Sequence, residues 1–293
     1  MTMPPSDLQE LLAVVDSGAR TRYEVFTGPA LPTPHGRAFG GHVLGQALVA
    51  AGLTVPAGRN LHSMHGYFLR PGDSTQKMTF EVADLYDGRS FSTRRTQVYQ
   101  DGNALMSMIS SFQNDDEGLE HQSDFDVASV TPPEALPSVW EKYGHLADEG
   151  RASWILNRPF DFRYVETDIV LRVPERTAKQ LVWMRARNTM SGGELMHRAA
   201  LALGSDFVLL EPIARKHGYP WATAGMKMAS LDHAMWFHRP FSVDEWLLFV
   251  MDSPTAQGGR GLGRGEFYDQ AGRLVASVAQ EGTIRPPRGR DEA

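Results

Sequence analysis

Part of this sequence recurs at an offset of 169 residues. Seven residues of the first half reappear in the second half in one ungapped stretch. They are Phe68, Arg70, Pro71, Phe80, Arg95, Tyr99 and Leu105, and they fall on Phe237, Arg239, Pro240, Phe249, Arg264, Tyr268 and Leu274. Self-similarity at a fixed spacing is typical of a duplicated structural unit. We therefore expect the chain to contain two copies of one arrangement of helix and strands.

The order of predicted elements is the same in both halves. In the first half, a pair of glycines opens a helical pattern over residues 40–51, and residues 65–113 alternate in polarity as strands do. In the second half, residues 194–204 have a helical pattern and residues 227–284 return to strands. A helix followed by an antiparallel sheet is the simplest fold for each half.

Between the halves the composition changes. Residues 114–117 form an acidic cluster, and residues 131–137 contain three prolines, which disfavour regular structure. We therefore expect a first unit at residues 1–118, a linker at 119–160 and a second unit at 161–293 that carries the catalytic residues.

The composition excludes several classes of protein. The 293 residues include no cysteine, which removes a disulfide scaffold, a thiolate metal site and a cysteine nucleophile. The net charge of -6 is unfavourable for general binding to nucleic acid. No stretch approaches the roughly 18–20 apolar residues that span a bilayer, and no basic segment followed by an apolar run marks a signal peptide. We expect a cytoplasmic protein with no membrane insertion and no nucleic-acid partner.

Five strings of residues are long or unusual in composition. They are Phe39-Gly40-Gly41-x-Val43-x-Gly45-Gln46-Ala47-Leu48, His65-x-Tyr67-Phe68-Leu69-Arg70-Pro71-Gly72-Asp73, Asp232-His233-x-Met235-Trp236-Phe237-His238-Arg239-Pro240-Phe241, Arg264-Gly265-Glu266-Phe267-Tyr268 and Gln280-Glu281-Gly282. Together they resemble the acyl-CoA thioesterase II (TesB-like) family over nearly the whole chain. The resemblance implies an α+β double hotdog fold, in which two tandem repeats each wrap a long helix in a curved antiparallel β-sheet. It also implies hydrolysis of fatty acyl-CoA without a cofactor or metal.

The resemblance places the family's catalytic aspartate, hydroxyl residue and glutamine on Asp206, Ser230 and Gln280. The hydroxyl position of the family resembles a threonine site, so Ser230 keeps the hydroxyl but lacks the methyl group. His42 stands where the family often has glutamine. We expect these departures to affect the rate, the chain-length preference and the pocket of the first half.

The residues themselves support part of this assignment. A helix over residues 194–206 places Asp206 at the C-terminal end of a buried face, where the helix dipole disfavours a carboxylate. Gln280 shares a strand face with apolar residues, so its buried amide needs a hydrogen-bonding partner. A structural alternative exists for each residue: Asp206 begins a loop, Gln280 binds a neighbouring backbone group, and Ser230 fills space in a strand.

The predicted mechanism is direct attack by water on the thioester. We expect Asp206 to act as general base while Ser230 and Gln280 orient the water. Backbone N–H groups after Gly40-Gly41, at a helix N-terminus, are the predicted donors to the oxyanion.

The predicted substrate-binding residues are Gly41, His65, Arg260 and Arg264. The two arginines are candidates for the phosphates of coenzyme A, because guanidinium groups bind phosphate well. The alternative for both arginines is a solvated surface position. The glycine-rich segment 258–264 lacks the spacing of a nucleotide-binding loop, and we expect a hairpin turn there.

Three other functions compete with thioester hydrolysis. A serine hydrolase would need Ser230, Asp232 and His233 in a relay, but strand alternation puts His233 on the face opposite the other two. This leaves Asp232 as a second candidate for water activation and His233 as a packed histidine. A hotdog hydratase or dehydratase would use a histidine near the helix entrance, where His42 stands. A non-catalytic acyl-CoA-binding protein would release no thiol.

Two further expectations concern metals and assembly. The ten histidines form no spacing typical of a metal site, so we predict none. Unpaired sheet edges and the hotdog resemblance predict a homodimer or higher homo-oligomer.

Overall fold

The computed structural model describes residues 7–19, 23–146 and 154–287. The strands are β1 (Val15–Asp16), β2 (Glu24–Gly28), β3 (Arg59–Phe68), β4 (Met78–Asp87), β5 (Phe91–Gln100), β6 (Asn103–Asn114), β7 (Phe160–Tyr164), β8 (Lys179–Ala186), β9 (Lys227–Ser230), β10 (Asp232–Phe237), β11 (Leu247–Gln257), β12 (Arg260–Asp269) and β13 (Leu274–Arg285). The helices are α1 (Leu8–Leu12), α2 (Gly40–Gly52), α3 (Val139–Tyr143), α5 (Gly193–Ser205) and α6 (Glu211–Lys216). The predicted order is confirmed, because α2 precedes β3 to β6 and α5 precedes β9 to β13. Within the described ranges, no helix has the length and apolar character needed to cross a membrane.

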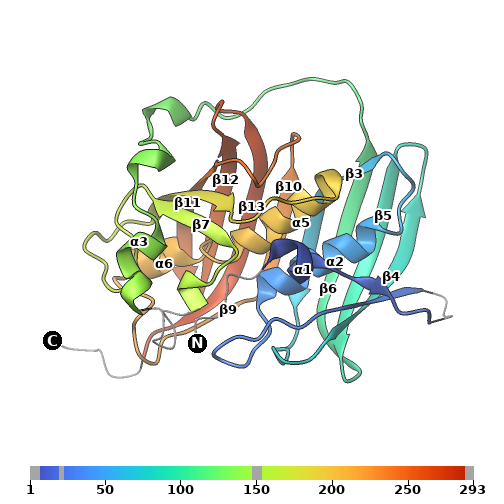
Figure 1. The fold of residues 1–293 in the computed structure, drawn as a ribbon, viewed down its shortest axis with the longest axis horizontal. Coiled ribbons are helices and arrows are strands. Elements are labelled where there is room, and N and C mark those ends of the chain that lie inside the picture. Colours follow the sequence, from blue (N-terminus) through green and yellow to red (C-terminus); the bar gives the residue numbers. More distant parts are fainter. Residues whose placement is uncertain (1–6, 20–22, 147–153, 288–293) are drawn as a thin grey trace.

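The strands form one antiparallel sheet. Its order is β1-β2-β4-β5-β6-β3-β10-β13-β12-β11-β8-β7, with β9 paired to β13 beside this path. At the middle, β3 pairs with β10, so that Tyr67 lies opposite Asp232 and Ser63 opposite Trp236. This pairing joins the strands of the first half to those of the second half. Figure 1 shows α2 and α5 side by side against the sheet, with the first half on the right.

The two long helices pack against each other very closely. A Cβ atom added to Gly41 would lie 2.4 Å from the carbonyl oxygen of Leu203, and one added to Gly45 would lie 3.2 Å from that of Ala199. Side chains at these two positions would therefore force the helix backbones apart. Because Gly41 meets the end of α5 while Gly45 meets its middle, the helices run antiparallel. The N-terminus of α2 thus lies against the C-terminus of α5.

Buried polar side chains fasten the N-terminal helix over this pair. His42 Nε2 and Gln46 Nε2 both donate to the carbonyl oxygen of Leu11, each at 2.8 Å. Burial lowers the pKa of His42 to about 4, which keeps its ring neutral. These bonds satisfy buried donor groups that would otherwise destabilise α2.

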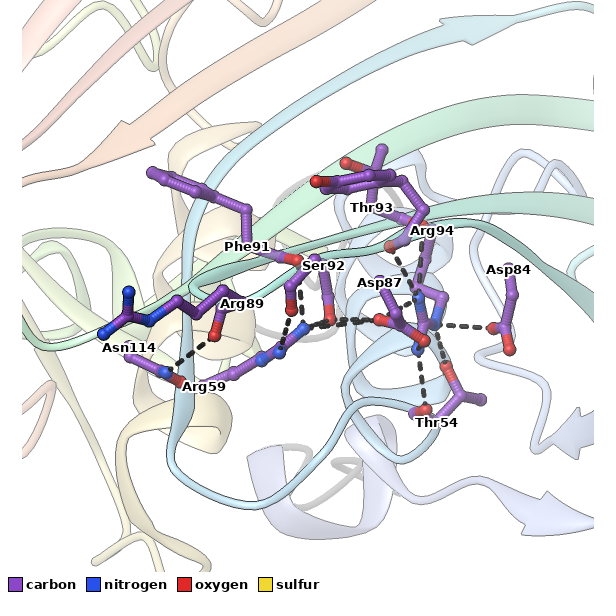
Figure 2. Close-up of polar contacts among 12 residues, drawn as sticks. Thr54, Arg59, Asp84, Asp87, Arg89, Phe91, Ser92, Thr93, Arg94 and Asn114 are labelled. Carbon is purple, nitrogen blue, oxygen red and sulfur yellow. Dashed lines mark hydrogen bonds and ion pairs between the residues drawn. The ribbon is translucent and has the colours of Figure 1, made fainter.

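A charged cluster holds the other end of α2 (Figure 2). The side chain of Arg94 is 1% exposed and binds Asp84 at 2.7 Å and Asp87 at 3.0 Å. The guanidinium also donates to the side-chain hydroxyl and the backbone carbonyl of Thr54, just beyond the helix. A cation at a helix C-terminus satisfies carbonyl groups and complements the dipole. Arg94 therefore ties α2 to the hairpin of β4 and β5.

The connection between the halves packs against the second half. It contains the short 3₁₀ helices η1 (Val127–Ser129), η2 (Pro133–Ala135) and η3 (Gly144–Leu146) as well as α3. Gln122 accepts from the N–H of Leu274 and donates to the carbonyl of Gly272, and Trp183 Nε1 donates to Thr131. The expectation that residues 131–137 lack regular structure was wrong at η2, where Pro133 begins a short 3₁₀ helix.

Candidate functional site

Asp206 sits where the ends of the two helices meet. It is the C-cap residue of α5, as its predicted place at the end of a buried helical face required. Its Oδ2 accepts a hydrogen bond of 2.7 Å from the N–H of Gly41 in the first turn of α2. The C-terminal dipole of α5 disfavours a carboxylate, whereas the N-terminal dipole of α2 favours one. The antiparallel packing therefore supplies the positive helix end that Asp206 lacks on its own helix.

The structure brings the three predicted catalytic residues together. Gln280 Nε2 on β13 donates to Asp206 Oδ1 at 2.7 Å, and Ser230 Oγ at the end of β9 donates to the same oxygen at 3.0 Å. Gln280 Nε2 also donates to Ser230 Oγ. Gln280 is fully buried, whereas Asp206 and Ser230 are partly buried. The expected partner of the buried amide is thus confirmed.

A local irregularity brings Ser230 and His233 to the same side of the sheet. Ser230 of β9 pairs with Gly282, and Ala234 of β10 pairs with Ala279. The first pair of positions is therefore four residues apart, whereas their partners on β13 are three residues apart. The extra residue is a β-bulge, which reverses the alternation of side chains beyond it. The prediction that Ser230 and His233 lie on opposite faces was therefore wrong, because it assumed one regular strand.

His233 is the member of this cluster that the sequence did not identify. Its Nδ1 lies 3.2 Å from Gln280 Oε1 and its Nε2 lies 3.0 Å from Ser205 Oγ. It was expected to be a packed histidine, and it is fully buried, but both ring nitrogens have polar partners. The available signal was a histidine next to an aspartate in an otherwise apolar strand, and the bulge hid its relation to Gln280.

A serine relay is nevertheless absent from the described residues. The ring of His233 binds Ser205 and Gln280 rather than Ser230. The carboxylate of Asp232 accepts the N–H of Glu281 at 2.7 Å instead of contacting a histidine. Burial raises the pKa of Asp232, but this residue stands opposite the exposed Tyr67 of β3, so its side chain is on the outer face of the sheet.

Burial tunes Asp206 toward neutral pH. It raises the pKa of the carboxyl group to about 6, and the hydrogen bonds from Gln280, Ser230 and Gly41 only partly offset this effect. A carboxylate has about four acceptor positions, and the described residues donate to three of them. A base with a pKa near the working pH is suited to deprotonate a water molecule that donates to it.

Aromatic residues enclose the carboxylate. Phe39 precedes α2 and stacks on Phe207 with ring centroids 4.3 Å apart. A Cβ atom on Gly40 would lie 2.8 Å from Asp206 Oδ2 and 3.0 Å from the ring of Phe68. Even a methyl group at Gly40 would therefore clash with both the carboxylate and the ring of Phe68, so glycine permits their close approach.

The other predicted substrate-binding residues lie apart from this cluster, except for Gly41. His65 is exposed on the outer face of β3, edge-on to Trp236 at 5.0 Å between ring centroids. Arg260 Nε donates to Glu281 at 2.9 Å, and Arg264 makes two bonds to Asp252, at 3.0 and 2.6 Å. Binding of coenzyme A phosphates by either arginine would have to compete with these carboxylates, and it stays a prediction.

The predicted hairpin turn before Arg260 is present. Gly258 and Gly259 connect β11 to β12 with φ of 61° and 75°. Two successive residues with positive φ are typical of a tight two-residue hairpin, which glycine adopts readily.

Known proteins resemble this chain along most of its length. A family model described as acyl-CoA thioesterase matches residues 157–283, and one described as acyl-CoA thioesterase N-terminal domain matches residues 29–113. Human acyl-coenzyme A thioesterase 8 is 35% identical over 297 residues, which cover 96% of this chain and 91% of the human protein.

Solved structures agree with these matches. Acyl-CoA thioesterase II TesB2 from Mycobacterium marinum is 37% identical with a TM-score of 0.77, and the alignment covers 97% of this chain and 99% of that one. A conserved Alicyclobacillus acidocaldarius protein with a hot dog fold is 18% identical with a TM-score of 0.75, covering 96% of this chain and 98% of that one. The second likeness shows the fold alone, and the chain has a hotdog fold.

The raised pKa of Asp206 predicts that Asp206→Asn removes a loss of stability that the wild type shows as pH rises. In the unfolded chain an aspartate has a pKa of about 3.9, whereas in the folded protein that of Asp206 is about 6. The folded state binds the extra proton between these values, so the wild type loses about 2–3 kcal/mol of stability as pH rises from 4 to 6. Urea unfolding at pH 4 and pH 8 should show the variant gaining relative to wild type.

The exposed Asp124 provides the control for this measurement. Asp124→Asn should leave the dependence of stability on pH unchanged, because the side chain is exposed. A difference between wild type and Asp206→Asn that is the same at pH 4 and pH 8 would contradict the account of this carboxylate.

Proposed function

We propose that Asp206, Ser230 and Gln280 hold the hydrolytic water, on the premise that this chain belongs to the acyl-CoA thioesterase II family and is an acyl-CoA hydrolase. The observation that supports this proposal is the convergence of two side chains and one backbone N–H on a single carboxylate. A water bound to that carboxylate has its base and its orienting groups within one cluster.

The reaction proceeds through a tetrahedral intermediate. Asp206 accepts a proton from water while the water oxygen forms a bond to the thioester carbonyl carbon. Ser230 and Gln280 restrict the orientation of the water, which lowers the entropic part of the barrier. The oxyanion then re-forms the carbonyl group as the C–S bond breaks, and the thiolate of coenzyme A takes up the proton held by Asp206. This step regenerates the carboxylate and releases the free fatty acid. A thiolate leaves readily, so orientation and moderate base catalysis suffice.

The first turn of α2 is the proposed site for the oxyanion. The N–H of Gly41 donates to Asp206, while the N–H groups of His42 and Val43 donate to the carbonyl oxygen of Phe39 within the helix. Once Asp206 has accepted the proton, its neutral carboxyl group competes less strongly for the Gly41 N–H. The donor is then available to the oxyanion at the moment when negative charge develops there.

We also propose that the fold consists of two tandem hotdog repeats at residues 1–118 and 161–293, joined by the segment 119–160. Each repeat would wrap one 13-residue helix, α2 or α5. The strands β3 to β6 correspond to β10 to β13 at an offset of 169 residues, whereas α5 follows α2 by 153. The second repeat accommodates this difference with the segment that contains α6.

Localisation and assembly complete the proposal. A cytoplasmic location and a homodimer or higher homo-oligomer stay predictions. Exposed Tyr67, Ile109 and Trp236 on neighbouring strands at the middle of the sheet support an assembled state, because aromatic and aliphatic residues of this size gather at interfaces.

The hydratase alternative loses the residue that favoured it. The ring of His42 is buried and donates to Leu11, so it is held against α1 rather than in the Asp206 cluster. A non-catalytic acyl-CoA-binding protein would bind the same ligands without releasing thiol, and the following experiment separates it from a hydrolase.

Free-thiol release from short, medium and long acyl-CoAs tests the proposed site. Asp206→Asn should lower kcat by roughly 10²–10⁴-fold because the base is lost, and Gln280→Ala by roughly 10–100-fold. In the wild type, kcat should fall as pH decreases through about 6, where Asp206 becomes protonated. Asp232→Asn is the matched carboxylate control and should keep wild-type turnover. Normal turnover by Asp206→Asn would remove the base from this mechanism.

Variants of Ser230 test the hydroxyl separately. Ser230→Thr should retain turnover within a few-fold, because the hydroxyl that binds Asp206 is preserved. Ser230→Ala should lower kcat by roughly 10-fold or more, since a hydrogen bond to a charged group is removed. Steady-state kinetics on one acyl-CoA distinguishes the two variants, and equal activities would show that the hydroxyl is dispensable.

A further inference from the structure

The ring of His233 lies completely buried between the end of α5 and the amide of Gln280. Its Nε2 is 3.0 Å from Ser205 Oγ, and its Nδ1 is 3.2 Å from Gln280 Oε1. Neither nitrogen contacts Asp206 or Ser230, so the ring does not touch the reacting atoms. We propose that His233 is a positioning residue that holds the Gln280 amide in the one orientation that serves Asp206. This inference rests on the proposed function of Asp206 and Gln280.

The contacts of Gln280 determine which nitrogen of His233 carries the proton. Gln280 presents its Nε2 to both Asp206 and Ser230, so its Oε1 faces the histidine. A carbonyl oxygen can only accept, and Nδ1 must therefore donate. Burial lowers the pKa of His233 to about 4, so the neutral ring has one N–H and Nε2 is an acceptor. In this tautomer the single hydroxyl proton of Ser205 must point to Nε2, so it is not available to the carbonyl oxygen of Ala202, the other acceptor within reach.

The opposite tautomer would disable the cluster. With the proton on Nε2, the lone pair of Nδ1 would attract the NH₂ group of Gln280 and turn its carbonyl oxygen toward Asp206 Oδ1. Two acceptors would then face each other at the 2.7 Å separation that now holds a hydrogen bond. An ionised Asp206 therefore requires His233 in the Nδ1–H form.

Ser205 links this orientation to the helix end that carries the base. It is the last residue of α5 and directly precedes Asp206. Its Oγ lies 2.9 Å from the carbonyl oxygen of Ala202 and 3.0 Å from His233 Nε2, and its single proton can go to only one of these two acceptors. The polar contacts therefore run from Ser205 through His233 and Gln280 to Asp206. Ser205 and Asp206 are adjacent residues at the end of α5. Such a closed arrangement fixes the amide relative to the carboxylate more firmly than packing alone would.

Loss of the His233 donor should change both the rate and its dependence on pH. A Gln280 amide that is free to rotate spends less time donating to Asp206, and that donation lowers the pKa of the carboxyl group. The fall of kcat at low pH, which we call the acid limb, should therefore occur at higher pH when the His233 side chain is replaced. Substrate contacts are untouched, so KM should change little.

Two substitutions separate positioning from packing. His233→Leu removes both polar contacts and should lower kcat roughly 10–100-fold, with KM within a few-fold of wild type and the acid limb at higher pH. In His233→Asn the amide nitrogen stands close to the place of Nδ1, so it can donate to Gln280. This variant should regain most of the lost kcat and return the acid limb toward that of wild type.

Two controls accompany these variants. Val98→Ala removes buried apolar contacts in the first half and should lower stability without moving the acid limb. The double variant His233→Leu with Gln280→Ala should be no slower than Gln280→Ala alone, because His233 acts through that amide.

The tautomer of His233 can be observed directly in the wild-type protein, so this test does not depend on whether a His233 variant folds. In the ¹⁵N-histidine spectrum of the wild type at neutral pH, His233 should carry its proton on Nδ1. A proton on Nε2 would overturn the inference, as would wild-type kcat and an unshifted acid limb in His233→Leu, or additive losses in the double variant. If Asp206→Asn and Gln280→Ala themselves keep wild-type thiol release, the proposed function fails instead, whatever the tautomer.

Discussion

The hydrogen bond from the Gly41 N–H to Asp206 depends on the close antiparallel contact of α2 and α5. Glycines at the helix crossing permit that contact, because even a methyl group at Gly41 would overlap the carbonyl of Leu203. The contact places the positive end of one helix at the negative end of the other. Asp206 can therefore be buried enough for its pKa to rise to about 6 and still be stabilised as an anion. A looser helix pair would leave the carboxylate facing only the unfavourable end of its own helix.

The two ends of the helix pair have different chemistry. At one end, Asp206 meets Ser230 and Gln280; at the other, Arg94 binds the end of α2 and two aspartates (Figure 2). At the offset of 169 residues, Leu61 and Ser111 stand in the places of Ser230 and Gln280. Leu61 has no polar group, so this pair cannot supply the two side-chain donors that bind Asp206. An arginine with its carboxylates stabilises one helix end, while the other end holds the carboxylate that we propose as the base.

Local patterns in the sequence predicted much of the fold and only part of the site. Both long helices and the strand-rich segments follow from the spacing of apolar residues, and Asp206 lies at the end of α5 as that spacing indicated. The contact of Asp206 with Gly41 depends on packing between elements 165 residues apart, which no local pattern encodes. The bulge between Ser230 and Ala234 depends on pairing with β13, and it reversed the predicted position of His233. Family resemblance, rather than spacing, selected Ser230.

The fate of solvent oxygen in a single turnover tests the central claim most directly. With enzyme in excess over acyl-CoA in H₂¹⁸O, direct attack by the water bound at Asp206 places one ¹⁸O atom in the released fatty acid and none in the peptide that contains Asp206. Mass spectrometry of both products would show this result if Asp206 acts as a base. An unlabelled fatty acid together with ¹⁸O in the Asp206 carboxylate would contradict it, because the carboxylate itself would then have attacked the thioester.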